Sequence, residues 1–306
     1  MYKPFTWVST LLFVALLSAA PANANTSLNV IASFSILEDL VKRVAGDLVS
    51  VNVIVPAGND VHRWELTPPN VLALEETHIV FYNGLGLEPW MRHVEAMSDE
   101  QLMLVNVAKK ADYAPLTIST GQYQGQPDPH MWMDPTGAAA YIDVIAETLA
   151  EHLPEQADVL YARAEEARKA LVILSQAVQE RLEGIPQTNR TLLTSEAGFG
   201  YFARAFGFEA QGVWGVNHET QGSAQAMAKM SEYLADKRPR PSALFFESTT
   251  ANIHMDALAR ETGLPLAGPL YVDSLSRADG PAANYFAMMR HNAEVLHKAL
   301  GGARAE

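Results

Sequence analysis

Short hydrophobic runs alternate with amphipathic segments in both halves of the chain. In the first half this pattern predicts strands over residues 28–33, 51–55, 78–82 and 102–107, and helices over 36–45 and 69–75. In the second half it predicts extended segments over 191–194, 243–247 and 266–272, and helices over 199–206, 224–235, 253–262 and 282–300. Strands that alternate with helices of this length indicate mostly parallel sheets. We therefore predict an α/β fold with two doubly wound parallel-sheet lobes.

The segment between the two halves has a different pattern. After Pro154 there is no Pro or Gly before Gly184, and apolar residues recur three or four positions apart, at Leu160, Ala164, Ala167, Leu171, Leu174, Val178 and Leu182. Pro suits the first turn of a helix, and Gly suits the position after the last turn. This predicts one rigid helix over 154–184, about 45 Å long. An isolated coiled coil is the alternative, but no other segment repeats in heptads, which favours a helix packed along both lobes.

The first residues have the features of a secretory signal peptide over 1–24. Lys3 is positively charged, residues 11–20 are apolar but too few to span a bilayer, and Ala22-Asn23-Ala24 is a small-residue cleavage site. An uncleaved anchor is the alternative. Cleavage would leave an N-terminal lobe over 25–153, the linking helix over 154–184 and a C-terminal lobe over 185–306. We expect the mature protein in a bacterial periplasm, without membrane insertion.

Composition narrows the range of partners. Hydrophobic residues make up 48% of the chain, which is enough for a core. The net charge is −13, and loss of Lys3 makes it −14, which argues against nucleic acid or anionic membranes as partners. The chain contains no Cys, which excludes disulfides, thiolate metal ligands and a lipid attached to a Cys. We expect a soluble, non-lipidated monomer.

Four candidate metal ligands lie far apart in the sequence, each at or just after the end of a strand-like run. They are His62, His130, Glu196 and Asp273, separated by 68, 66 and 77 residues. Open α/β sheets bind ligands at the carboxyl ends of their strands, so two facing sheets would bring two of these residues from each half together. Two imidazoles and two carboxylates form a divalent-metal site. Taken singly, each residue could instead be a surface residue, a turn residue or a helix cap.

Five segments together resemble one known family, the cluster A-I metal-binding receptors of ABC importers for manganese, iron or zinc. They are His62-Arg63-Trp64-Glu65-Leu66-Thr67-Pro68, Asn83-Gly84-Leu85-Gly86-Leu87-Glu88, Asp128-Pro129-His130-Met131-Trp132, Thr194-Ser195-Glu196 and Tyr271-Val272-Asp273-Ser274-Leu275. The resemblance covers nearly all of the mature chain. It implies two α/β lobes joined by the long helix, a metal in the interlobe cleft, a membrane permease as partner and no catalytic activity. It also implies that His62, His130, Glu196 and Asp273 are the ligands.

The resemblance and the donor chemistry together favour Mn(II) as bound cargo, with Fe(II) and Zn(II) as alternatives. In this family a His at the third ligand position usually marks zinc receptors, whereas this chain has Glu196. Zinc receptors of the family often carry a His-rich loop before the second ligand, and residues 111–127 contain no His. Carboxylate oxygens suit harder cations such as Mn²⁺. Affinity alone does not decide, since such a site binds Zn²⁺ more tightly than Mn²⁺.

The sequence also allows roles for residues near the four ligands, and it allows other classes of function. Glu65 and Glu247 are either partners of the ligating imidazoles or surface and capping residues. We expect Asp128 and Asp134 to form turns or caps, and Trp64, Trp132 and Trp214 to be packing residues. A periplasmic metallohydrolase is the rival function, because the same donors could activate water. No zinc-protease motif, nucleophile elbow or Walker loop is present. An adhesion or structural role has no sequence feature of its own.

Overall fold

The N-terminal half forms a parallel sheet with helices on both faces. The structure is a computed structural model that describes residues 28–121, 123–215 and 223–301. Its first sheet has the order β2-β1-β3-β4, and all neighbouring strands run parallel. The strands are β1 (Leu28–Phe34), β2 (Val49–Val55), β3 (Ile79–Tyr82) and β4 (Met103–Asn106). The helices are α1 (Ser35–Ala45), α2 (Pro68–Glu75), α3 (Met91–Met97), α4 (Val107–Lys110), the 3₁₀ turn η1 (Met131–Met133) and α5 (Pro135–His152).

The C-terminal half repeats this arrangement. Its parallel sheet has the order β6-β5-β7-β8, which is the same pattern of crossovers as in the first sheet. The strands are β5 (Thr191–Thr194), β6 (Glu209–Gly212), β7 (Leu244–Glu247) and β8 (Leu266–Leu270). The helices are the 3₁₀ turn η3 (Gln187–Asn189), α7 (Gly200–Phe206), α8 (Ala224–Asp236), α9 (Ile253–Thr262) and α10 (Tyr285–Leu300). The predicted fold class, two doubly wound parallel-sheet lobes, is confirmed.

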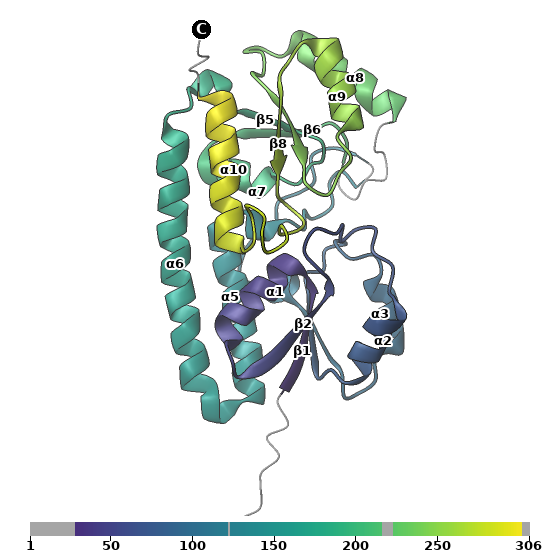
Figure 1. The fold of residues 1–306 in the computed structure, drawn as a ribbon, viewed down its shortest axis with the longest axis vertical. Coiled ribbons are helices and arrows are strands. Elements are labelled where there is room, and N and C mark those ends of the chain that lie inside the picture. Colours follow the sequence, from purple (N-terminus) through teal and green to yellow (C-terminus); the bar gives the residue numbers. More distant parts are fainter. Residues whose placement is uncertain (1–27, 122, 216–222, 302–306) are drawn as a thin grey trace, which may run out of the picture.

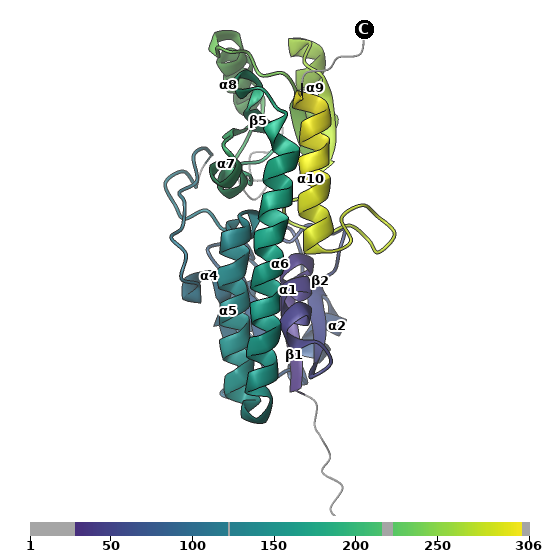
Figure 2. The ribbon, with the colours of Figure 1, turned by 90° about the vertical axis from the view of Figure 1, so that its left-hand side faces the viewer.

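A long helix runs along both lobes. It is α6 (Ala157–Glu183), preceded by the 3₁₀ turn η2 (Pro154–Gln156), so the α-helix begins three residues later than predicted. Its buried residues are Leu160, Ala164, Ala167, Leu171, Leu174, Val178 and Leu182, the set that the spacing predicted. Figures 1 and 2 show α6 spanning the length of the molecule, beside α5 in the lower half and α10 in the upper half. The linking helix is therefore one member of a helical layer.

The sequence pattern did not predict helix α5, strand β6 or the short helices α3 and α4. Helix α5 has 11 buried residues in 18, so it has no simple polar face, although Asp134 as cap and Pro135 in the first turn signal its start. Strand β6 is half exposed and contains Glu209 and Gln211, so it has no hydrophobic run. Helix α3 is only seven residues long. Short or fully covered elements carry a weak periodic signal.

The main hydrophobic core spans both lobes. It joins the N-terminal sheet to α1, α5, α6 and α10, whereas a smaller cluster lies around Trp214 and Met255 in the C-terminal lobe. Across the described ranges, no helix combines the length and the hydrophobicity that a membrane span requires. The predicted signal peptide over 1–24 lies outside the described residues.

Candidate metal centre

His62 lies in the loop after β2, and the backbone around it fixes the orientation of its ring. Its Nδ1 lies 3.0 Å from the carbonyl oxygen of Leu87. A carbonyl only accepts hydrogen bonds, so Nδ1 is the donor and Nε2 is the atom available to bind a cation. The indole of Trp90 donates to the carbonyl oxygen of Val61 (2.9 Å), which holds the preceding residue in place. The side chain of His62 is buried.

His130 immediately precedes η1, at the end of a long irregular segment rather than at the end of a strand. One oxygen of Asp128 accepts hydrogen bonds from both the backbone N–H of His130 (3.0 Å) and its ring Nδ1 (2.7 Å). Asp128 is therefore the turn former that the sequence indicated, and it also orients the ring. As with His62, this leaves Nε2 as the metal-binding atom.

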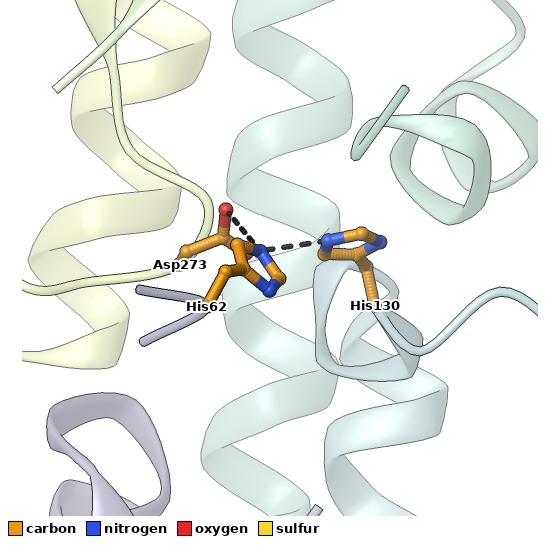
Figure 3. Close-up of side chains that lie close together, drawn as sticks. All are labelled: His62, His130 and Asp273. Atoms are coloured by element: carbon orange, nitrogen blue, oxygen red, sulfur yellow. Dashed lines mark ion pairs between the residues drawn. The ribbon is translucent and has the colours of Figure 1, made fainter. Parts of the chain in front are cut away.

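Asp273 connects the two imidazoles. Its Oδ2 lies 3.3 Å from Nε2 of His62, and its Oδ1 lies 3.2 Å from Nε2 of His130 (Figure 3). The three side chains are buried, and each offers one ligand atom within 4.8 Å of the others. The fold thus brings together three of the four predicted ligands, from three loops that are distant in the sequence.

The segment that carries Asp273 follows β8 but is bonded to the N-terminal lobe. The carbonyl of Val272 accepts a hydrogen bond from the indole of Trp132 (2.9 Å). On the other side, the backbone N–H of Leu275 donates to Ser35 Oγ (3.0 Å), and its carbonyl accepts from Gly58 (2.9 Å). Asp273 is therefore held between two N-terminal-lobe anchors, which the expectation of two ligands per lobe did not foresee.

Glu196 lies beside this group, in the loop after β5, and is buried. Its backbone N–H donates to Glu247 Oε1 (3.0 Å), and its Oε1 lies 3.4 Å from the indole nitrogen of Trp214. A Cβ added at Gly198, two residues later, would lie 3.4 Å from His130 Nε2, so this loop lies against the imidazole. Glu196 is adjacent to the three-residue group but is not among the ligand atoms that lie within 4.8 Å of one another.

The charges of these buried groups shift one another's pKa. Burial lowers the pKa of His130, but Asp128 and Asp273 outweigh burial and raise it to about 10. Burial also lowers the pKa of His62, and Asp273 and Glu196 reverse that effect, so that the pKa is raised. Burial alone would raise the pKa of Asp273, yet the two imidazoles hold it well below its usual range. A cation that binds here must therefore displace protons from the imidazoles.

Of the two roles left open for Glu65 and Glu247, the structure favours the one in which neither orients an imidazole. Glu65 is exposed, and Glu247 bonds to the backbone of Glu196 rather than to an imidazole. Burial and the charge of Glu196 raise the pKa of Glu247 well above its usual value. The actual partners are the carbonyl of Leu87 and the carboxylate of Asp128. The sequence could have indicated the role of Asp128, because an Asp two residues before a His can reach its ring. It could not have indicated the role of the Leu87 carbonyl, because every residue has a backbone carbonyl.

The remaining expectations concern packing residues. Trp132 and Trp214 are fully buried, and Trp64 packs against the edge of the main core, as predicted. Asp134 caps α5 by accepting from the N–H of Thr136 (2.8 Å), which confirms its role as a cap. His62 and His130 lie edge to face, with ring centroids 6.3 Å apart. The arrangement is a buried group in which two imidazole nitrogens face one carboxylate, and such a donor set suits one small divalent cation.

Comparison with known proteins gives consistent relatives over nearly the whole chain. A family model described as ZnuA, zinc-uptake complex component A, periplasmic, matches residues 30–299. The iron-binding protein YfeA of Yersinia pestis is 31% identical over 288 residues, which are 94% of this chain and 91% of that protein. The manganese-binding lipoprotein MntA of Halalkalibacterium halodurans is 32% identical over 274 residues, 89% of this chain and 88% of that protein.

Solved structures of similar proteins have the same fold. The Mn-bound periplasmic metal-binding protein of Candidatus Liberibacter asiaticus superposes with a TM-score of 0.79 at 28% identity, covering 90% of this chain and 100% of that one. The periplasmic zinc-binding protein TroA of Treponema pallidum superposes with a TM-score of 0.82 at 26% identity, covering 90% of this chain and 99% of that one. The names of these relatives include manganese, iron and zinc.

Proposed function

Because this chain belongs to the family of periplasmic zinc-uptake component A proteins, we propose that it captures Mn²⁺ and delivers it to the permease of an ABC importer. The chain is a periplasmic metal-binding receptor of the ABC-importer type, as its relatives are. Manganese as the cargo is our inference from the donor set. Fe²⁺ and Zn²⁺ are the alternatives, since relatives of each kind match over most of the chain.

The proposed ligands are His62, His130, Asp273 and Glu196. The proposal rests mainly on the position of the Asp273 carboxylate. Its Oδ2 lies 3.3 Å from Nε2 of His62, and its Oδ1 lies 3.2 Å from Nε2 of His130. In both rings the opposite nitrogen is held by an acceptor, which is the usual arrangement of histidines that bind metals. We assign Glu196 as the fourth ligand because it is buried beside this group and its charge reaches His62.

The choice of Mn²⁺ depends on the two carboxylates. Each can supply one or two oxygens, so the coordination number can exceed four, which suits a hard cation better than the tetrahedral geometry of zinc. A site of this kind still binds Zn²⁺ more tightly in the general order of affinities. Selection in the cell therefore depends on which metal is available and on which metal-bound form the permease accepts.

We further propose that residues 1–24 are a cleaved signal and that the mature receptor is a monomer without a lipid anchor. The relative MntA is named a lipoprotein, but this sequence has no Cys that could carry a lipid. The functional division into a lobe over 25–153, a link over 154–184 and a lobe over 185–306 is part of the same proposal. It agrees with α6 as the long element between the two sheets.

The proposal is tested by titrating chelator-stripped protein with Mn²⁺ in a calorimeter. We expect one Mn²⁺ per chain in the wild type and a large loss of affinity in His130→Ala. His93→Ala, which changes an exposed histidine on α3, is the matched control and should bind as the wild type does. A wild type that binds no divalent metal would overturn the receptor assignment. Zn²⁺ or Fe²⁺ in protein taken from its native periplasm would overturn only the choice of Mn²⁺.

A further inference from the structure

A tight turn between β3 and α3 contacts both His62 and the segment of His130. It comprises Asn83-Gly84-Leu85-Gly86-Leu87-Glu88, and the buried carboxylate of Glu88 closes it. Glu88 Oε1 accepts from the backbone N–H of Asn83 (2.7 Å) and from Ser33 Oγ at the end of β1 (2.7 Å), and Oε2 accepts from the N–H of Gly84 (3.0 Å). One carboxylate thus ties the start of the turn to its end and to the neighbouring strand.

The backbone of this turn requires such support. Gly84, Leu85 and Gly86 all have positive φ, at 83°, 53° and 81°, and Leu85 is the one non-glycine residue of the described ranges in that region. A side chain such as that of Leu85 is disfavoured there by roughly 1 kcal/mol or more. A Cβ at Gly84 would lie 2.3 Å from the side chain of Asn106, so another residue would fit here only if that side chain moved. The hydrogen bonds to the Glu88 carboxylate stabilise this backbone conformation.

One end of the turn orients His62. The carbonyl of Leu87, the residue before Glu88, accepts from Nδ1 of His62 at 3.0 Å. That contact selects the tautomer and the ring orientation that direct Nε2 toward Asp273. The position of the Leu87 carbonyl follows from the closure of the turn by Glu88.

The other end of the turn orients the segment of His130. The side-chain amide of Asn83 donates to the carbonyl of Pro129 (3.1 Å), the residue before His130. Tyr141 on α5 donates its hydroxyl to Asn83 Oδ1 (2.5 Å), which fixes the direction of the amide. Asn83 is fully buried, so these bonds have no competition from water.

We infer that Glu88 is a positioning residue for metal binding: by closing the turn over 83–88 it sets the orientation of His62 through Leu87 and of His130 through Asn83. Glu88 itself touches neither imidazole in any contact described above. The inference rests on the proposed function, because it assumes that the two imidazoles bind the cargo. One carboxylate would thus align two ligands that are 68 positions apart in the sequence.

The test uses Glu88→Gln in the full-length mature protein. The amide keeps the shape but directs an N–H₂ group at positions now occupied by donors, so the turn should shift. We expect Mn²⁺ affinity to fall about ten- to a hundredfold, as is usual when a group that orients a ligand is lost. The visible spectrum of Co²⁺-loaded protein, which reports ligand geometry, should change as well. Asp39→Asn, which alters a partly buried carboxylate bonded to a backbone N–H (Tyr285, 3.1 Å), is the control; it should change neither.

A double-mutant cycle with His62→Ala separates positioning from general loss of stability. If Glu88 acts through the imidazoles, Glu88→Gln should weaken binding less in the His62→Ala background than in the wild type. Ser33→Ala, which removes one of the three donors to Glu88, is the milder variant if Glu88→Gln does not fold, and it should lower affinity several-fold. A wild type that binds Mn²⁺ together with Glu88 and Ser33 variants of unchanged affinity and Co²⁺ spectrum would overturn this inference alone. No metal binding in the wild type would overturn the proposed function instead.

Discussion

The indole nitrogen of Trp132 donates a hydrogen bond to the carbonyl oxygen of Val272, with 2.9 Å between the two atoms. Trp132 lies in η1 of the N-terminal lobe, and Val272 follows β8 of the C-terminal lobe. The next residue is Asp273, so this bond holds the carboxylate against His62 and His130. If the lobes move, Asp273 should therefore remain with the two histidines, and Glu196 should be the ligand that separates from them.

Replacing Trp132 with Phe should weaken metal binding. The change keeps an aromatic ring but removes the N–H, which leaves the buried carbonyl of Val272 without this donor. The loss of one such bond is worth about 1 kcal/mol, which corresponds to roughly fivefold in affinity. Calorimetric titration with Mn²⁺ measures this change. Trp64→Phe, whose N–H donates to Asn70 (3.2 Å) away from Asp273, is the control, and equal affinities in the two variants would contradict the anchoring role.

Replacing Glu196 with His should shift selectivity toward Zn²⁺. An imidazole is a softer donor than a carboxylate and cannot bind through two oxygens, so it favours zinc over manganese. We expect the ratio of Zn²⁺ to Mn²⁺ affinity to rise on the order of tenfold, or about 1.4 kcal/mol. Competition titrations with a chromophoric chelator measure the ratio. Glu196→Gln should weaken the binding of both metals, and an unchanged ratio in Glu196→His would remove Glu196 from the ligand set.

Metal affinity should continue to rise at pH values well above the usual histidine pKa of about 6.5. With its pKa raised to about 10 by Asp128 and Asp273, His130 holds a proton that a cation must displace. Binding of Mn²⁺ should therefore keep strengthening with pH until about pH 10, where the free imidazole loses its proton. Asp128→Asn removes one of the two carboxylates, so this upper limit should move to lower pH. An affinity that stops rising near pH 7 in the wild type would contradict the assignment.

The same pKa shift predicts the opposite trend for the stability of protein stripped of metal. A raised pKa in the folded state means that the charged His130 stabilises folding fully below the unfolded value of about 6.5. That contribution should be lost as pH rises from there to about 10. The thermal midpoint of the wild type, compared with His130→Gln across this range, measures it. The difference between the two proteins should narrow with rising pH.

Helix α6 offers a paired test of the long link. Leu174 is buried against the rest of the helical layer, whereas Val172, two positions earlier, is 58% exposed. Leu174→Ala should lower the free energy of unfolding by about 2–5 kcal/mol, because it leaves a cavity. Val172→Ala should change it by no more than about 0.5 kcal/mol. Chemical denaturation measures both, and similar values for the two would place the buried face of α6 elsewhere.

A link of this kind should also limit the motion of the lobes. Since α6 packs against α1, α5 and α10, rotation of one lobe would disrupt packed side chains over the length of the helix. We therefore expect small-angle scattering to show little change in the radius of gyration when Mn²⁺ is added. A large decrease would indicate a wide hinge closure and would contradict the rigid link.

Local patterns in the sequence were sufficient for much of the fold. The buried face of α6, from Leu160 to Leu182, follows from spacing alone, because a helix places every third or fourth residue on one side. Helix α5 and strand β6 were missed for the opposite reason, since the surroundings of one and the exposure of the other leave no periodic contrast. Periodicity reports burial only where one side of an element differs from the other.

The candidate site divides along the same line. The residue types and the family motifs identified His62, His130, Glu196 and Asp273 as candidate ligands. In a chain without Cys, the common protein ligands for divalent metals are His, Asp and Glu. Only the tertiary structure decided that Asp273 joins the two imidazoles, that Glu196 lies at their side, and that Leu87 and Asp128 orient the rings. Those relationships depend on loops brought together across gaps of 66 to 77 residues and on backbone carbonyls, which every residue has. The sequence determines which side chains can bind a metal, whereas the distances between them and their orientations are determined only by tertiary packing.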